Sequence, residues 1–259
     1  MGRGRSGSRA RVPRDRDTDH WREAWETWDA NNSRWENKQA FIKDFAGDFE
    51  VTEEEERVVY KSFASDGFPQ GYIKTSNSYR INQEFYNPAN EGKSLEELFP
   101  RTLRDGTKTD IRTIRTLDKL INQNKTKRNA VFTRYTDARA LTDVFGFTSD
   151  QIQSLVDFSH NPAKLKELSD GFKGRSTYSK SYTSTSANRE ANVFKYKEFE
   201  RRIYTPAGTK AFACKENPVE SETIFGRGMK TSLMRITYEH GHIVLHEYME
   251  GYDNKKLPK

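Results

Sequence analysis

The sequence has little of what several common protein classes require. Among its 259 residues there is one cysteine, Cys214, which excludes an internal disulfide and a cysteine-based zinc site. No apolar run approaches the roughly 18 residues that a membrane-spanning helix needs. The N-terminus is basic but no hydrophobic stretch follows it, so we expect no secretory signal peptide. These absences predict a protein of the cytoplasm of a host or target cell, a reducing compartment.

Apolar residues are also scarce. Hydrophobic residues make up 33% of the chain and charged residues 32%, which is enough for one core of modest size. Aromatic residues, at 12%, offset part of the shortage because each ring buries a large area. We therefore expect one main domain, over residues 55–259, preceded by extensions.

The positive charge of the chain is concentrated at its N-terminus. Residues 1–16 contain six arginines and one acid, Asp15, and so hold five of the six net positive charges. A segment rich in Gly, Ser and Arg buries too little apolar surface to fold, and we predict a disordered tail over residues 1–20. The tail either keeps the protein soluble or binds nucleic acid or an acidic partner by electrostatic attraction.

All the tryptophans of the chain come next, in a predicted helical extension over residues 21–54. The first three share one helix face because they stand at i, i+4 and i+7. This face either packs on the main domain or docks on a partner, such as a virion or a carrier protein. The tryptophans are Trp21, Trp25, Trp28 and Trp35.

Helices are predicted in the first half of the chain. Residues 51–65 read as a helix that begins with a capping box, in which Thr52 is the N-cap and Glu55 stands three positions on. Residues 111–124 have apolar side chains along one side and predict a second helix. A shorter helix is expected at 79–86, between loops.

The second half of the chain predicts a sheet. Its segments are short, rich in β-branched and aromatic residues, and separated by turn signals. A helical interlude at 151–172 stands between the first two. The pattern predicts an α+β fold. The expected strands lie within 129–136, 181–187, 201–208, 209–214, 221–228, 232–239 and 242–250.

Hydroxyl and acidic side chains stand on two of these strands. In "SYTSTSA", strand alternation places Ser184 and Ser186 on one face and Thr185 on the other. In "ESE", Glu220 and Glu222 share a face, and two carboxylates so close together ionise unequally. Taken singly, each feature also occurs in strands with a purely structural role.

The order of these features along the chain is more specific. Arg134 on the first strand, then an aromatic followed by Ser-Thr-Ser, then Glu-x-Glu before "IFGRGMK", resembles the Arg/Ser-Thr-Ser/Glu-x-Glu class of mono-ADP-ribosyltransferases, which includes bacterial toxins and phage enzymes. The resemblance covers roughly residues 55–255. Its most specific part is "IYTPAGTKAFACKENPVESETIFGRGMKTSLMRI". It implies two packed, mainly antiparallel sheets, a split β-sandwich, around an NAD cleft with N-terminal helices. It also implies NAD+ as a substrate and no metal.

The resemblance implies a role for each of these residues. Glu222 stabilises the oxocarbenium-like transition state that forms when the bond between nicotinamide and ribose breaks, and Ser184 orients Glu222. Arg134 holds a phosphate or the nicotinamide-side ribose, because its planar fork suits pairs of oxygen atoms. Thr185 and Ser186 line the cofactor cleft mainly by pinning its strands.

Glu220 is implied to decide which side chain is modified. Members with glutamate at this position generally modify arginine, and those with glutamine choose other side chains. A second carboxylate can orient a guanidinium and take its proton. The preceding loop, 214–219, is expected to touch the target protein. The implied activity is transfer of ADP-ribose from NAD+ to arginine side chains of a target protein, by a phage or bacterial effector.

Further NAD contacts are implied by two segments. "SYRIN", with Tyr79 and Asn82, is similar to the helix that flanks the NAD cleft. Residues 191–202 stand where the family has a loop that closes over nicotinamide. The candidates to stack on the nicotinamide ring are Phe194, Tyr196 and Phe199, and those to lie near phosphate are Arg201 and Arg202.

Two positions depart from the family pattern. Tyr135 stands where a glycine usually follows the first-strand arginine. The helix after Asn82 continues "QEFYN" where many relatives have leucine-arginine, so no second phosphate-binding arginine is assigned there. The second departure concerns the binding of the pyrophosphate rather than the bond that breaks.

Other functions remain open from the sequence. His240, His242 and His246 share a face of a predicted strand, but the first and last are about 20 Å apart on a straight strand, too far for one zinc ion. A binding module would keep the fold and attach to nucleic acid or a particle through the basic tail and tryptophan helix. Transfer to RNA is a third possibility. The intact set of motif residues favours the protein-modifying enzyme.

Overall fold

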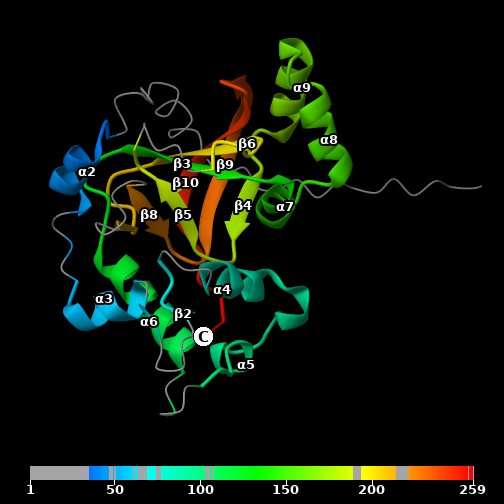
Figure 1. The fold of residues 1–259 in the computed structure, drawn as a ribbon. Helices are drawn as coiled ribbons and strands as arrows, with labels where there is room; N and C mark the ends of the chain where they lie inside the picture. The colour runs from blue at the N-terminus through cyan, green and yellow to red at the C-terminus, as the bar shows by residue number, and fades with distance from the viewer. Residues whose placement is uncertain are drawn as a thin grey trace, which may run out of the picture.

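A computed structural model describes most of the chain from Trp35 onward. The described residues are 35–46, 49, 51–60, 62–63, 69–73, 77–102, 106, 108–188, 194–213, 221–255 and 257–258. The predicted tail, the helix with Trp21, Trp25 and Trp28, and Glu220 lie outside them. Figure 1 shows one large sheet with two groups of helices at opposite ends. The predicted α+β fold is confirmed.

The three helices predicted in the first half of the chain are present, and the one that follows Thr52 is shorter than predicted. The capping box at Thr52 is present, with the Thr52 side chain accepting from Glu55 N and the Glu55 side chain accepting from Thr52 N. The helix stops at Val59 rather than at 65, because β1 begins at Ser62. The elements of this group are α2 (Lys38–Asp44), α3 (Glu53–Val59), α4 (Asn77–Tyr86), η2 (Pro88–Asn90), α5 (Leu95–Leu98) and α6 (Thr109–Gln123), with the hairpin of β1 (Ser62–Phe63) and β2 (Pro69–Gln70).

A second group of helices follows the first strand of the large sheet. Here the predicted interlude is confirmed at α8 (Ser149–Asp157) and α9 (Pro162–Phe172). It is preceded by α7 (Ala138–Ala140) and a π-helical turn, η3 (Leu141–Phe145), which no pattern in the sequence predicted. No helix of the described residues is long and apolar enough to cross a membrane.

The large sheet has its strands in the order β4-β9-β10-β6-β3-β5-β8-β7. Neighbours are antiparallel except β6 and β10, which run parallel. The strands are β3 (Ala130–Thr136), β4 (Ser176–Ser179), β5 (Thr183–Ser186), β6 (Phe199–Thr205), β7 (Phe212–Ala213), β8 (Glu222–Phe225), β9 (Met229–Glu239) and β10 (His242–Tyr252).

The expected split of the β-structure is present, in a different form. β3 and β5 are joined at one residue pair, Thr133 with Ser186, whereas β3 and β6 pair along their whole length. The strands therefore form one continuous hydrogen-bonded sheet instead of two separate sheets. This single pair is the split of the sheet, and Arg134 and Ser184 lie next to it in their strands.

Two apolar clusters hold the helices on the sheet. The larger one contains Trp35, whose ring stacks on Phe45 with centroids 5.5 Å apart and also contacts Phe132 of β3. The chain from Trp35 therefore packs on the main domain, whereas the face formed by Trp21, Trp25 and Trp28 lies outside the described residues. The smaller cluster lies under η3, α8 and α9, and includes Leu141, Leu155 and Leu245.

Candidate active site

Three strands bring an arginine, a serine and a glutamate together at the split. Arg134 of β3 donates from Nη1 to the carbonyl oxygen of Ser184, at 2.6 Å. Ser184 of β5 donates from Oγ to Glu222 Oε1, at 2.5 Å. Arg134, Ser184 and Glu222 thus lie close together although they are far apart in the sequence, and Glu220 lies outside the described residues.

The strand register explains the contact between Ser184 and Glu222. β5 and β8 are antiparallel with Ser186 opposite Glu222 and Ser184 opposite Ile224. Glu222 therefore shares a face with Ser186 directly across from it and with Ser184 two positions on, which is the diagonal neighbour. The side chain of Glu222 is buried, with 7% of the residue exposed, so its carboxylate is shielded from solvent.

Arg134 is a cation in unfavourable surroundings. Burial lowers the pKa of its guanidinium, and the charge of Arg201, its cross-strand partner on β6, lowers that pKa further. Among the described residues no carboxylate lies within ion-pair distance of Arg134. A half-buried guanidinium beside a like charge is a ready site for an anionic ligand group.

The other two hydroxyls of the Ser-Thr-Ser motif form hydrogen bonds with backbone atoms. Thr185 is buried and donates to the carbonyl oxygen of Thr223 at 2.8 Å, which pins β5 to β8. Ser186 Oγ accepts from Asn188 N at 3.3 Å and shapes the turn after the strand. Of the three, Ser184 is the one that directs its hydroxyl to Glu222.

Asn82 and Tyr79 occupy different environments on α4. Asn82 donates from Nδ2 to the hydroxyl of Tyr72, at 2.9 Å. Tyr79 projects outward, with 61% of the residue exposed. Asn82 is thus held by Tyr72, whereas Tyr79 is open to a ligand or to solvent.

Tyr72 is a residue that the sequence reasoning missed. It is 3% exposed, and burial raises the pKa of its phenol. That pKa is also influenced by the charges of Arg134 and Glu222, which places the ring beside the site. The structure requires a glycine just before it, since Gly71 has φ +85 and a Cβ there would lie 1.9 Å from Tyr60 O.

One of the three aromatic candidates for stacking on nicotinamide is misplaced. Phe199 is the first residue of β6 and is fully buried in the smaller cluster, so it packs in the core and does not face a ligand. Phe194 and Tyr196 precede the strand and are 38% and 82% exposed. Residues 191–193 lie outside the described part of the chain, and residues 199–202 of the expected loop belong to β6.

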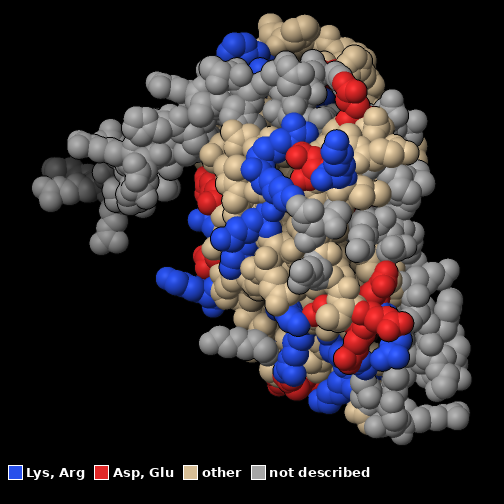
Figure 2. Space-filling view, turned by 90° about the vertical axis from the view of Figure 1, so that its left-hand side faces the viewer, with Lys and Arg blue, Asp and Glu red and all other residues tan. Residues whose placement is uncertain are grey.

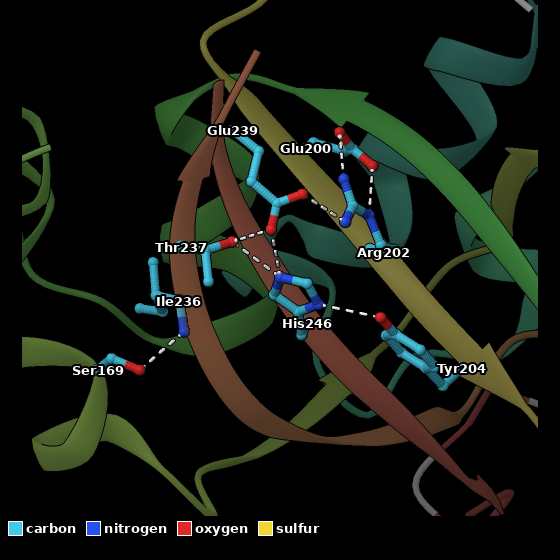
Figure 3. Close-up of polar contacts among 8 residues, drawn as sticks. All are labelled: Ser169, Glu200, Arg202, Tyr204, Ile236, Thr237, Glu239 and His246. Carbon is cyan, nitrogen blue, oxygen red and sulfur yellow. Dashed lines mark hydrogen bonds and ion pairs between the residues drawn. The ribbon is translucent and has the colours of Figure 1, made fainter. Parts of the chain in front are cut away.

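Arg201 and Arg202 are not placed to bind phosphate. Arg201 makes a two-pronged ion pair with Glu247, at 2.7 Å for both contacts, and both side chains are buried. Arg202 pairs with Glu200 at 2.9 Å and with Glu239 at 2.8 Å (Figure 3). Each guanidinium is therefore engaged by carboxylates within the sheet.

The histidines of β10 do not form a metal site. His240 lies in the turn before the strand, with φ 52, and His246 is fully buried. His246 is hydrogen-bonded to Tyr204 at 3.2 Å and to Thr237 at 2.9 Å (Figure 3). Among the described residues, no group of His, Cys, Asp and Glu is arranged to hold a metal ion.

An acidic residue of α6 holds the ends of β5 and β8. Asp118 accepts from the hydroxyl of Tyr182 at 2.6 Å and forms an ion pair with Arg227. Tyr182 directly precedes β5 and Arg227 follows β8, so Asp118 ties together the strands that carry Ser184 and Glu222. The guanidinium of Arg227 also lies over the Phe85 ring, 5.0 Å from its centroid.

A family model described as "ADP-ribosyltransferase exoenzyme" matches residues 70–253, which include the whole of this site. The chain belongs to the ADP-ribosyltransferase exoenzyme family. A comparison with curated protein sequences finds no significant match.

Solved structures with the same fold are bacterial ADP-ribosyltransferases. C3stau2 from S. aureus, solved with NAD, is 18% identical, with a TM-score of 0.58, 86% of this chain covered and 94% of that one. The Clostridium limosum C3 exoenzyme is 17% identical, with a TM-score of 0.57 and coverage of 84% and 96%. Plx2a, a toxin from Paenibacillus larvae, is 16% identical, with a TM-score of 0.52 and coverage of 89% and 95%. These structures share the fold of the ADP-ribosyltransferase domain described above.

Proposed function

We propose that this ADP-ribosyltransferase transfers ADP-ribose from NAD+ to arginine side chains of target proteins and releases nicotinamide. The observation that carries the proposal is the contact of Ser184 with Glu222 beside Arg134, at the split of the sheet. Each member comes from a different strand, and together they supply a carboxylate, a donor that orients it and a cation for the anionic part of the dinucleotide.

The chemistry follows from these groups. The bond between nicotinamide and C1′ of the ribose breaks, its electron pair leaves with nicotinamide, and positive charge develops on the ribose. Glu222, held by Ser184, stabilises that charge through its carboxylate in a site of low polarity. Arg134 binds a phosphate or the nicotinamide-side ribose. Asn82, Tyr72 and the exposed Tyr79 border the same ligand, and Phe194 or Tyr196 covers the nicotinamide ring.

Arginine is the proposed acceptor because of Glu220. One nitrogen of the acceptor guanidinium attacks C1′ and loses a proton, for which a second carboxylate is a suitable base. Glu220 lies outside the described residues, and its role rests on the Glu-x-Glu motif. Ser221 between the two acids is buried with φ 45, a left-handed conformation that fixes the chain as it enters β8.

The experiment uses labelled NAD+ with agmatine, a small guanidine, and with proteins of a bacterial lysate. We expect the wild type to label agmatine and lysate proteins and to release nicotinamide. Glu222→Gln should lose both the labelling and the release. Glu220→Gln should abolish transfer to agmatine but keep hydrolysis of NAD+ by water. Label on agmatine that survives Glu222→Gln would contradict the proposal.

A second candidate function is favoured by the arginine-rich segment 1–16. A binding module of this fold would attach to nucleic acid or a particle and leave NAD+ intact, whereas an RNA-modifying enzyme would label RNA in the same assay.

For the protein-modifying enzyme, we propose an effector of phage or bacterial origin that acts in the cytoplasm of a host or target cell, with packaging in a virion as one route of delivery.

A further inference from the structure

Two neighbouring segments of the chain carry basic residues and no acids. Residues 122–130 contain Lys125, Lys127 and Arg128, and residues 206–213 contain Lys210, with no Asp or Glu in either. Figure 2 shows Lys and Arg side chains gathered on this face of the molecule, which is the side of α2 in Figure 1. The charge is therefore local and does not depend on the N-terminal tail.

Backbone hydrogen bonds hold the two segments side by side. Thr126 N donates to Thr209 O at 2.8 Å, and Gly208 N donates to Thr126 O at 2.7 Å. These bonds place Lys125 and Lys210 opposite each other in an antiparallel bridge. Like charges directly across a bridge destabilise it. The fold thus holds two exposed lysines together although their charges repel each other. An acidic partner would relieve this repulsion.

The basic area extends to α2. The guanidinium of Arg128 lies 4.4 Å from the centroid of the buried Trp35 ring and pairs with Asp44 at 2.9 Å. Lys43, next to Asp44, is exposed on the same helix. We use the name "basic surface" for Lys43, Lys125, Lys127, Arg128 and Lys210.

We infer that the basic surface receives an acidic face of the target protein. The inference rests on the proposed function, and it specifies the surface charge of the target protein that is modified. Lys210 lies three residues before Ala213, the last residue of β7, which is roughly 10 Å along an extended strand, and Ala213 pairs with Thr223, next to Glu222. A protein that presents an arginine to Glu222 and extends more than roughly 10 Å beyond it therefore reaches Lys210.

A protein partner fits this surface better than a nucleic acid does. Single-stranded nucleic acids bind to basic grooves that also offer aromatic side chains for base stacking. The exposed large aromatics of the described residues are Tyr79, Phe194 and Tyr196, none of which belongs to these segments, and Trp35 is buried under Arg128. Lysines on a surface of this kind steer an acidic protein and raise the rate of encounter.

The test compares two double variants. Each replaces two lysines by glutamates, so both change the net charge of the protein by the same amount. Lys125→Glu/Lys210→Glu alters the basic surface, and the control, Lys164→Glu/Lys173→Glu, alters two exposed lysines, one in α9 and one directly after it. Binding of fluorescein-labelled deca-glutamate is followed by anisotropy at low and high salt. We expect the first variant to raise Kd about tenfold and the control to change it less than about twofold, with binding of the wild type lost at high salt.

Activity assays then connect binding to transfer. With labelled NAD+, the first variant should label lysate proteins about tenfold less efficiently and agmatine as well as the wild type does. No binding of deca-glutamate by the wild type, or equal binding by both variants, overturns the inference. Tighter binding of an oligothymidylate through the same lysines also overturns it, in favour of nucleic acid. A wild type that binds deca-glutamate but labels no agmatine refutes the proposed function instead.

Discussion

Ser184 donates its hydroxyl hydrogen to Glu222 across the β5–β8 pair, with 2.5 Å between Oγ and Oε1. The hydrogen bond fixes the direction of a buried carboxylate before any ligand is present. A carboxylate that stabilises positive charge without reorganising contributes most when it is held in this way. The relationship therefore links the Ser-Thr-Ser and Glu-x-Glu motifs through one contact.

Substitutions at this pair should separate orientation from charge. We expect Glu222→Gln to lower kcat for nicotinamide release at least about 100-fold, because the charge that stabilises the transition state is lost. Ser184→Ala should lower kcat about 10- to 100-fold, since a hydrogen bond to a charged group contributes about 1.5–3 kcal/mol. KM for NAD+ should change less than about threefold in Ser184→Ala. Full kcat in that variant would show that Ser184 does not orient Glu222.

Arg134 offers a test of anion binding. We expect Arg134→Lys to keep the charge but lose the planar fork, and so to weaken NAD+ binding about tenfold, as measured by calorimetry. Binding of ADP-ribose should weaken by a similar factor, because it carries the same phosphates. Arg139→Lys is the matched control, since Arg139 is exposed and pairs with Asp143 on α7 and η3. Unchanged affinity in Arg134→Lys would place the phosphates elsewhere.

Local signals in the sequence predicted local structure well. Thr52 and Glu55 form the capping box that their spacing predicts, and alternation in "SYTSTSA" gave the correct faces for Ser184 and Thr185. Phe199 was misassigned because an aromatic in a loop and one at the start of a buried strand look alike in sequence. The expected 191–202 loop was too long for the same reason.

Contacts between distant segments could not be predicted. Asp118 and Arg227 are 109 residues apart, and nothing in the helix pattern of α6 distinguishes Asp118 from a solvated acid. Tyr72 lies in a segment that reads as a loop, and only the fold brings it to Asn82. Such partners are fixed by tertiary packing, which periodicity does not encode.

Asp118 should affect both stability and catalysis. Because Asp118 engages Tyr182 and Arg227 in a largely buried site, we expect Asp118→Asn to lower the free energy of unfolding by about 2–4 kcal/mol. It should also lower kcat more than it raises KM for NAD+, since β5 and β8 lose a common anchor. Chemical denaturation and initial rates measure the two effects.

The control for Asp118 is a second ion pair of the same chemistry on the surface. Asp170 pairs with Lys166 on α9, where the side chains are 59% and 74% exposed. Asp170→Asn should cost less than about 0.5 kcal/mol, the range of exposed pairs. Equal costs for the two variants would mean that Asp118 is not an anchor of the site.

His246 predicts how stability depends on pH. Burial lowers its pKa to about 4 from the usual 6.5, against an opposing contribution from Glu239, and the charges of Arg235 and Arg202 lower it further. Between pH 6.5 and 4 the unfolded chain therefore binds a proton that the folded chain does not, so the free energy of unfolding falls as the pH is lowered. The full decrease is about 3 kcal/mol.

Glu239 changes stability in the same direction at lower pH. Its pKa is held far below the usual 4.5, mainly by the hydrogen bond with His246, so its contribution is present above pH 4.5 and lost as the pH falls. Urea denaturation of the wild type and of His246→Gln at several pH values measures the slopes. We expect the slope between pH 6.5 and 4.5 to flatten in His246→Gln, because that variant has no imidazole to protonate. A slope that persists unchanged in this interval would show that another group takes up the proton.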